Sequence, residues 1–149
     1  MKHITFEETV PYWKMLWENC TIRPKSGILL LDGFDKMMND NEEIIPTFFG
    51  VFRDDRIVGV NSGYSPAAFQ YRSRGLYVLP EYRRQGIAKE LLKASEDQGR
   101  KENKNLLWSM PRREALPVYL KFGFKSVSNF FKGRFGENCF VIKTISKSI

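Results

Sequence analysis

The sequence has few of the residues on which metal centres, disulfide frameworks and membrane anchors depend. Its only histidine is His3, and its only cysteines, Cys20 and Cys139, lie too far apart for a C-x-x-C pair. We therefore expect no metal site, no Ser–His–Asp triad, and free thiols in a reducing compartment. The longest apolar stretch, IIPTFFGVF, contains Pro46 and is too short to cross a bilayer. No apolar signal core is present near the N-terminus, so we expect a cytoplasmic protein without membrane contact.

The sequence does have a substantial apolar fraction and an excess of positive charge. Its 149 residues are 42% hydrophobic and 14% aromatic, which suits one domain spanning residues 1–149. The 24 Lys and Arg residues outnumber the 17 Asp and Glu residues, which gives a formal net charge of +7. A basic surface suits nucleic acid, a phosphate-bearing cofactor or an acidic macromolecule, and it also occurs in proteins with no charged partner.

Hydrophobic periodicity predicts an α/β domain with a mixed, mostly antiparallel sheet. Pro11 fits the first predicted helix only if that helix begins close to it. The predicted elements are a strand at 2–5, a helix at 6–19, a second helix at 27–40 broken near Gly33, a hairpin of 46–52 and 56–64, a strand at 71–79, a helix at 86–99, a strand at 105–110, a helix at 113–123 that ends at Gly123, and two late strands near 124–130 and 138–145.

The segment YRRQGIAKELL, residues 82–92, places two arginines and a glycine at the start of a predicted helix. Gly86 lets the backbone approach a ligand closely, and the free N–H groups of a first helical turn favour a negative charge. Arg83 and Arg84 can add charge-assisted hydrogen bonds. The pattern is neither a P-loop nor a G-x-G-x-x-G fingerprint. It predicts a pyrophosphate site, and the alternative is an ordinary turn with solvated arginines.

Residues 83–88, RRQGIA, resemble the [Q/R]-x-x-G-x-[G/A] signature of the GNAT N-acetyltransferase superfamily, whose loop binds the pyrophosphate of acetyl-CoA. A second stretch, ALPVYLKFGF (115–124), resembles the A-x-x-x-Y-x-K-x-G-F segment of that family. The resemblance implies a GNAT-like fold with a bulged central strand, about six to seven strands and about four helices. It also implies transfer of an acetyl group from acetyl-CoA to an amine by direct attack, without a metal.

The resemblance implies a role for individual residues. Tyr119 would be the catalytic acid that protonates the departing thiolate. Arg112 stands where many relatives have an asparagine just ahead of the second motif, and we place it with the cofactor contacts. The expected cofactor-binding residues are Leu76, Tyr77, Val78, Arg83, Arg84, Gln85, Gly86, Ile87, Ala88, Lys89 and Arg112.

The general base is the part of the family template that the sequence does not supply. Some members carry a glutamate on the central strand, where residues 70–74 read QYRSR and contain no carboxylate. Glu81, Asp32, Glu7 and Glu8 are weak candidates, and a water chain to solvent is the alternative.

Two alternatives to an active transferase remain. One is a GNAT-fold protein that binds acyl-CoA with little or no catalysis, because fold alone does not guarantee activity. The other is a small basic nucleic-acid-binding domain that uses the arginines of 72–84 with Tyr71, Tyr77 and Tyr82 interleaved. Basic residues spread along the chain and the lack of a nucleic-acid signature argue against the latter. The amine acceptor, and the choice between monomer and homodimer, stay open.

Overall fold

The computed structural model describes residues 1–17, 44–133 and 136–146. Its strands are β1 (Lys2–Ile4), β2 (Thr47–Arg53), β3 (Arg56–Ala67), β4 (Gln70–Val78), β5 (Leu106–Ser109), β6 (Lys125–Ser126), β7 (Phe131–Gly133), β8 (Gly136–Asn138) and β9 (Val141–Thr144). Its α-helices are α1 (Phe6–Leu16), α3 (Ile87–Lys101) and α4 (Leu116–Phe122), and a 3-10 turn, η2, covers Pro80–Tyr82.

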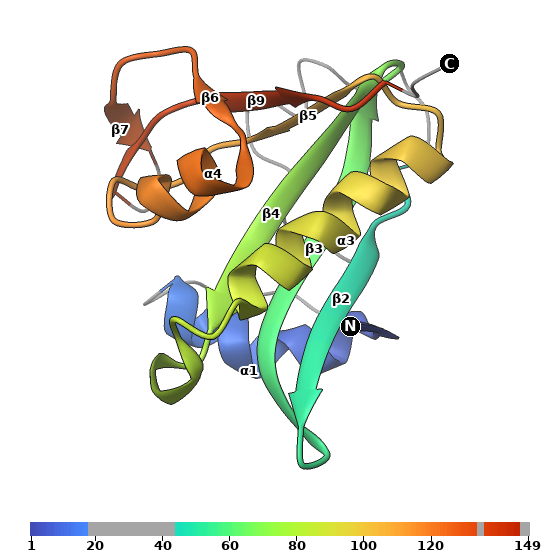
Figure 1. Cartoon of the computed structure of the whole chain (residues 1–149), viewed down its shortest axis with the longest axis vertical. Helices are drawn as coiled ribbons and strands as arrows, with labels where there is room; N and C mark the ends of the chain where they lie inside the picture. The colour runs from blue at the N-terminus through green and yellow to red at the C-terminus, as the bar shows by residue number, and fades with distance from the viewer. Residues whose placement is uncertain (18–43, 134–135, 147–149) are drawn as a thin grey trace.

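Seven strands form one sheet in the order β1-β2-β3-β4-β5-β9-β6, and β7 pairs with β8 in a separate hairpin (Figure 1). Of the pairings among the described residues, β4 with β5 is parallel and the others are antiparallel. The mixed, mostly antiparallel α/β fold predicted from the sequence is therefore confirmed. The predicted helix at 27–40 lies outside the described residues, and the late strands are more numerous and shorter than expected.

Helix α1 begins at Phe6, where the sequence analysis placed the start of the first helix. Thr5 and Glu8 form a capping box, in which the Thr5 side chain accepts from the Glu8 N–H and the Glu8 carboxylate accepts from the Thr5 N–H. This cap fixes the start at Phe6, so Pro11 lies inside the helix. The predicted start at residue 6 is therefore confirmed, and capping together with the burial of Phe6 and Trp13 offsets the backbone hydrogen bond that Pro11 cannot donate.

Helices cover both faces of the sheet. On one face, α3 packs Ile87 and Leu91 against Phe49 of β2 and its neighbours. On the other face, α1 packs Trp13 against Phe48, the next residue of β2. Successive residues of a strand point to opposite faces, so the adjacent pair in β2 serves two cores. A third cluster joins α3, α4, β5 and β9 and includes Tyr119 of α4.

The central strand β4 carries a bulge. Val60 of β3 lies opposite Tyr77, and Ser62 lies opposite Arg74, so β4 has one residue more than β3 over this stretch. Gly75 lies within the extra length and has a φ of +86°, a conformation that favours glycine. The bulge that the family resemblance implied is therefore present.

The bulge is held from the α1 side by a buried tryptophan. The indole Nε1 of Trp13 donates a hydrogen bond of 2.8 Å to the carbonyl oxygen of Gly75. A Cβ added at Gly75 would lie 2.4 Å from that same nitrogen. The close approach of indole and backbone therefore requires glycine at this position.

Beyond its first residues, β4 separates from β5. Pairing joins Gln70–Arg72 with Leu106–Trp108, and the two strands then diverge (Figure 1). Residues 73–78 of β4 consequently have no pairing partner in β5. An exposed strand edge of this kind offers N–H and C=O groups to an extended ligand.

Two further sequence expectations concern cysteine and membranes. Cys139 is buried and free, as predicted, while Cys20 lies outside the described residues. Among the described helices, none combines the length and the apolar character that a bilayer span requires.

We predict that Gly75→Ala destabilises the protein more than Gly86→Ala does. Both glycines have positive φ. A residue other than glycine in this conformation lowers the free energy of unfolding by about 1–2 kcal/mol. Only at Gly75 would the new methyl group meet Trp13, which adds about 1–3 kcal/mol of overpacking. Urea unfolding followed by tryptophan fluorescence measures the two losses. Equal losses would mean that the indole does not restrict this position.

Candidate active site

The loop from β4 into α3 leaves a helix start without a protein cap. Gly86 is the N-cap residue, with a φ of +79°, and within the described chain no side chain caps this end. Helix α1, by contrast, has a complete capping box. A Cβ built on Gly86 meets no atom within 4 Å, so the turn opens onto space. Uncapped N–H groups facing open space are the requirement for binding a phosphate at a helix start.

Arg83 secures this loop to the end of β4. Its Nε donates a 3.0 Å hydrogen bond to the carbonyl oxygen of Val78, and its guanidinium lies 5.6 Å from the ring centroid of Tyr77. The Val78 carbonyl therefore points away from β3. Leu76 and Val78 are among the residues that line the opening beside β5. Arg84, with a φ of +62°, is exposed in the same turn.

A single cleft of about 1950 Å³ joins the helix start to the opening between β4 and β5. Its walls come from β4, the start of α3, the segment after β5, α4, the β7–β8 hairpin and the end of α1. Ligand pockets in proteins are usually about 300–1,000 Å³, so this cleft has room for an extended cofactor together with a second substrate.

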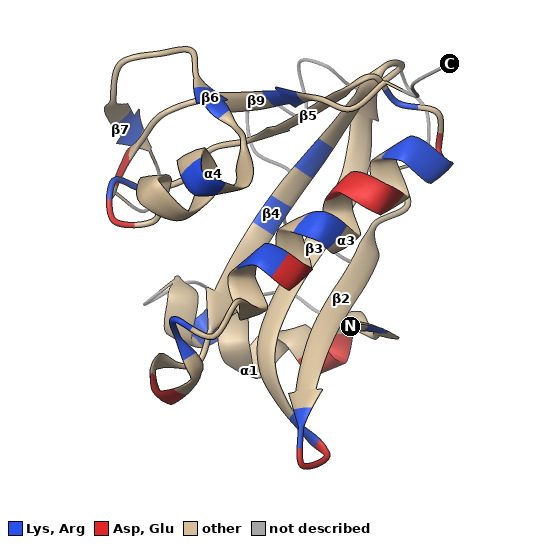
Figure 2. Ribbon diagram, viewed as in Figure 1, with Lys and Arg blue, Asp and Glu red and all other residues tan. Residues whose placement is uncertain are grey.

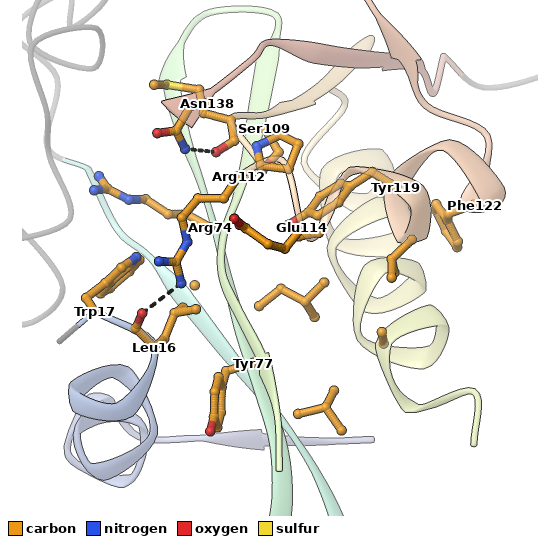
Figure 3. A pocket seen from close by; sticks show the side chains of 18 of the residues that line it. Leu16, Trp17, Arg74, Tyr77, Ser109, Arg112, Glu114, Tyr119, Phe122 and Asn138 are labelled. Atoms are coloured by element: carbon orange, nitrogen blue, oxygen red, sulfur yellow. Dashed lines mark hydrogen bonds between the residues drawn. The ribbon is translucent and has the colours of Figure 1, made fainter. Parts of the chain in front are cut away.

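The cleft brings together almost all of the predicted site residues. Its lining includes Leu76, Tyr77, Val78, Arg83, Arg84, Gly86, Ile87, Ala88, Lys89, Arg112 and Tyr119. Gln85 is exposed in the same loop but is not among the lining residues. Arg112 lies toward α1, where its Nη2 donates to the carbonyl oxygen of Leu16 at 2.9 Å (Figure 3). The individual roles of these residues stay predictions.

Tyr119 is the buried phenol of the site. Its side chain is 4% exposed and packs edge to face against Phe124, with centroids 5.3 Å apart. Burial raises the pKa of Tyr119 to about 12, while a hydrogen bond with Ser109 and the positive charge of Arg72 act in the opposite direction. The phenol therefore stays protonated at neutral pH and can act as a proton or hydrogen-bond donor.

Ser109 connects this phenol to the central strand, and sequence reasoning missed it. Its Oγ donates a 2.6 Å hydrogen bond to the carbonyl oxygen of Ser73 on β4. Ser73 in turn accepts at its Oγ from the Nδ2 of Asn61 and from the Oγ of Ser95 on α3. The phenol is thus positioned by a buried network that joins β3, β4, α3 and β5. Small polar residues inside otherwise apolar strand segments were the signal that could have revealed it.

The candidates for a general base do not gather at Tyr119. Glu8 is engaged in the cap of α1, while Glu7 and Glu81 are exposed and do not line the cleft. Asp32 lies outside the described residues. Glu114, which the sequence analysis did not consider, lines the cleft between Arg112 and Tyr119 (Figure 3).

Metal ligands do not gather in the part of the chain that the structure describes. No group of three or more His, Cys, Asp and Glu residues there is arranged to hold an ion.

A family model described as the acetyltransferase (GNAT) family matches residues 6–124. The chain belongs to the GNAT acetyltransferase family. The match spans both motifs and the bulged strand between β3 and β5. None of the curated proteins matches the chain.

Solved structures share the fold at low sequence identity. A GNAT-family acetyltransferase from Staphylococcus aureus Mu50 has a TM-score of 0.70 and 16% identity, with 97% of this chain and 99% of that chain covered. An aminoglycoside 6′-N-acetyltransferase complexed with coenzyme A has a TM-score of 0.69 and 15% identity, with 100% and 99% covered. An acetyltransferase from Bacillus cereus ATCC 14579 has a TM-score of 0.61 and 18% identity, with 73% and 81% covered.

The raised pKa of Tyr119 predicts a loss of stability at high pH. The unfolded chain releases this proton near pH 10, and the folded protein retains it to about pH 12. The contribution of the Tyr119 phenol to the free energy of unfolding is therefore complete below about pH 10. It is lost as the pH rises through 12, at roughly 1.4 kcal/mol per pH unit.

Tyr119→Phe should remove this dependence. The free energy of unfolding of the wild type minus that of the variant should fall by roughly 1 kcal/mol between pH 10 and 11, as measured in urea. The same difference at pH 8 is the reference, because the phenol is protonated in both states there. A difference that does not change with pH would show that the phenol is not buried in solution.

Proposed function

We propose that this protein is an acyl-CoA-dependent N-acyltransferase that transfers acetyl from acetyl-CoA to a primary amine in the cytoplasm. The observation that carries the proposal is the convergence of two features in one cleft. The uncapped turn at Gly86 lies at one end, and the buried phenol of Tyr119 lies beside the opening of β4. Acetyl-CoA would supply the activated thioester and the phosphates that bind at the turn.

The cofactor contacts are proposed from the charges and free backbone groups of this cleft. First-turn N–H groups after Gly86 would bind the pyrophosphate, with Arg84 and Lys89 adding positive charge. Arg83 would contribute mainly by holding the loop, because its Nε is engaged with Val78. The edge of β4 beyond its pairing with β5 would bind the pantetheine arm in the manner of an added strand, through the backbone of Leu76 and the N–H of Val78, whose carbonyl accepts from Arg83.

The strand edge also provides electrostatic stabilisation of the reaction. An outward N–H next to the bulge would polarise the thioester carbonyl and stabilise the oxyanion that forms on attack. One such donor contributes roughly 3–4 kcal/mol in enzymes where it has been removed. The bulge at Gly75 and the hydrogen bond from Trp13 would fix the direction of that N–H.

Tyr119 would assist departure of the thiolate. The C–N bond forms, the C–S bond breaks, and one amine proton is transferred in net to sulfur. A phenol with a pKa of about 12 is a weaker acid than a thiol with a pKa near 8.5. Tyr119 would therefore act first as a hydrogen-bond donor to the developing thiolate, with Arg72 stabilising negative charge on the phenol oxygen.

We predict that acetyl-CoA raises the thermal midpoint and that Gly86→Val abolishes this rise. A ligand at a hundred times its dissociation constant adds roughly 2.7 kcal/mol, which is very roughly 5–10 °C for a domain of this size. Valine at a φ of +79° would be strained and would fill the space in front of the turn.

Thermal unfolding with CoA, acetyl-CoA and duplex DNA at two salt concentrations tests this binding. The variant's own midpoint without ligand is the control for folding. A salt-sensitive shift with DNA, and none with either CoA form, would support a nucleic-acid-binding protein instead.

Tyr119→Phe should lower kcat at least about tenfold and leave the affinity for acetyl-CoA nearly unchanged. The reason is that the phenol acts on the leaving group while the cofactor is held at the other end of the cleft. Phe122→Leu, on the same helix, is the matched control for packing. Unchanged turnover in Tyr119→Phe would remove this residue from the mechanism, and acyl-CoA binding without any turnover would favour the catalytically weak alternative.

A further inference from the structure

The cleft contains a single acidic side chain among the described residues that line it. That residue is Glu114, and eight of the lining residues are basic. Figure 2 shows basic positions on β4, on α4 and in the loop that leads into α3. Any step of the proposed reaction that needs a carboxylate from this lining therefore depends on Glu114.

The backbone on both sides of Glu114 is held by hydrogen bonds. Before it, the N–H of Arg113 donates to the carbonyl oxygen of Glu137 at 3.3 Å, which joins this segment to the β7–β8 hairpin. After it, the N–H of Ala115 donates to the carbonyl oxygen of Arg112 at 3.0 Å. Ala115 also packs against the apolar cluster that joins α3, α4, β5 and β9. Glu114 therefore has a fixed place in the segment that leads into α4.

Glu114 and its neighbour Arg113 point to different sides of this segment. The guanidinium of Arg113 donates to the carboxylate of Glu137 through Nε at 3.2 Å and through Nη2 at 3.0 Å, and Arg113 does not line the cleft. Glu114 does line the cleft, and Figure 3 shows its side chain between Arg112 and Tyr119. The carboxylate and the buried phenol thus belong to the same part of the cleft.

The Glu114 carboxylate is accessible to a ligand. Its residue is exposed, and no hydrogen bond or ion pair within the described chain engages it. Two other carboxylates nearby are already paired, since Glu137 bonds Arg113, and Glu96 bonds Lys143. A carboxylate that lines a cleft without a protein partner can receive a cation from the substrate.

The proposed acceptor brings such a cation. An alkylamine has a pKa of about 10, so it arrives as an ammonium at neutral pH, whereas the nucleophile is the neutral amine. Once nitrogen has attacked the thioester, nitrogen and sulfur are attached to the same carbon atom. The groups that serve these two atoms must therefore lie close together. Tyr119 would serve the sulfur, and Glu114 lies beside Tyr119 (Figure 3).

We infer that Glu114 is a catalytic residue, which binds the ammonium group of the acceptor and accepts the proton that the attacking nitrogen loses. The inference rests on the proposed transferase function. The C–N bond forms, one proton passes from nitrogen to the Glu114 carboxylate, and the C–S bond breaks with its electron pair leaving on sulfur. Glu114 then releases its proton to solvent, and the thiolate takes one from solvent. Residues 70–74 of β4, which contain no carboxylate, need not supply a base.

Glu114→Gln tests the inference because it keeps the shape of the side chain and removes the charge. Release of CoA thiol is measured at saturating acetyl-CoA with ethylamine, benzylamine and glycinamide. For the amine that the wild type uses best, kcat/KM should fall about a hundredfold or more, as for loss of a general base. Glu114→Asp keeps the charge and should lose less. Glu81→Gln, at an exposed position that does not line the cleft, is the matched control and should change nothing.

A second comparison separates proton transfer from damage to the structure. Ethylamine and 2,2,2-trifluoroethylamine are similar in shape, but the fluorinated amine is far less basic and is mostly neutral at pH 7. Its nitrogen loses a proton readily to water after attack, so it depends less on a carboxylate. The loss caused by Glu114→Gln should be at least about tenfold smaller for trifluoroethylamine than for ethylamine. The thermal midpoint and the affinity for acetyl-CoA show whether each variant retains the fold and the cofactor site.

Unchanged turnover in Glu114→Gln would overturn the inference and favour a water chain to solvent as the base. An equal loss for both amines would also overturn it, because it would mean that Glu114 has a structural role. If the wild type binds acetyl-CoA but uses none of the amines, the catalytically weak alternative is favoured and the inference fails. Failure of acetyl-CoA to bind the wild type would instead overturn the proposed function itself.

Discussion

The separation of β4 from β5 is the constraint on which the rest of the site depends. The two strands pair over three residues each, Gln70–Arg72 and Leu106–Trp108, and then diverge. The bulge at Gly75 changes the course of β4 just beyond this point, and the Trp13 indole holds it there. A strand edge that would normally be buried in a sheet is thereby left open, at the cost of the ladder hydrogen bonds that a longer pairing would give.

Each side of this opening is stabilised by a different physical means. On the α3 side, β4 is held by apolar packing and by a buried network of hydrogen bonds. The network consists of Asn61, Ser73, Ser95 and Ser109. Ser109 in turn forms a hydrogen bond with Tyr119. On the α1 side, aromatic rings and a backbone carbonyl hold the guanidinium groups. A buried polar network is rigid when its members are paired, and this rigidity is what an acyl-transfer site needs around its reacting atoms.

How much of this could be predicted from the sequence depended on the range of the interactions. Gly86 and Gly123 were recognisable because left-handed caps are local features, and both have positive φ in the structure. The role of Ser109 depended on strands β4 and β5, which meet only in the folded protein. The β7–β8 hairpin was missed for a related reason, since strands of three residues carry too little periodicity to be seen. The start of the first helix at residue 6 was also predictable, because the capping box of Thr5 and Glu8 is local in the sequence.

The positions of the basic residues in the structure narrow the kinds of ligand that a basic composition suggests. A net charge of +7 alone suits nucleic acid as well as a phosphate-bearing cofactor. Among the described residues that line the cleft, eight are basic and one is acidic. A nucleic-acid surface would need such charges spread over an accessible face, along the path of a backbone. Basic residues at the start of α3, in the same cleft as a buried phenol, suit the phosphate groups of the proposed cofactor instead.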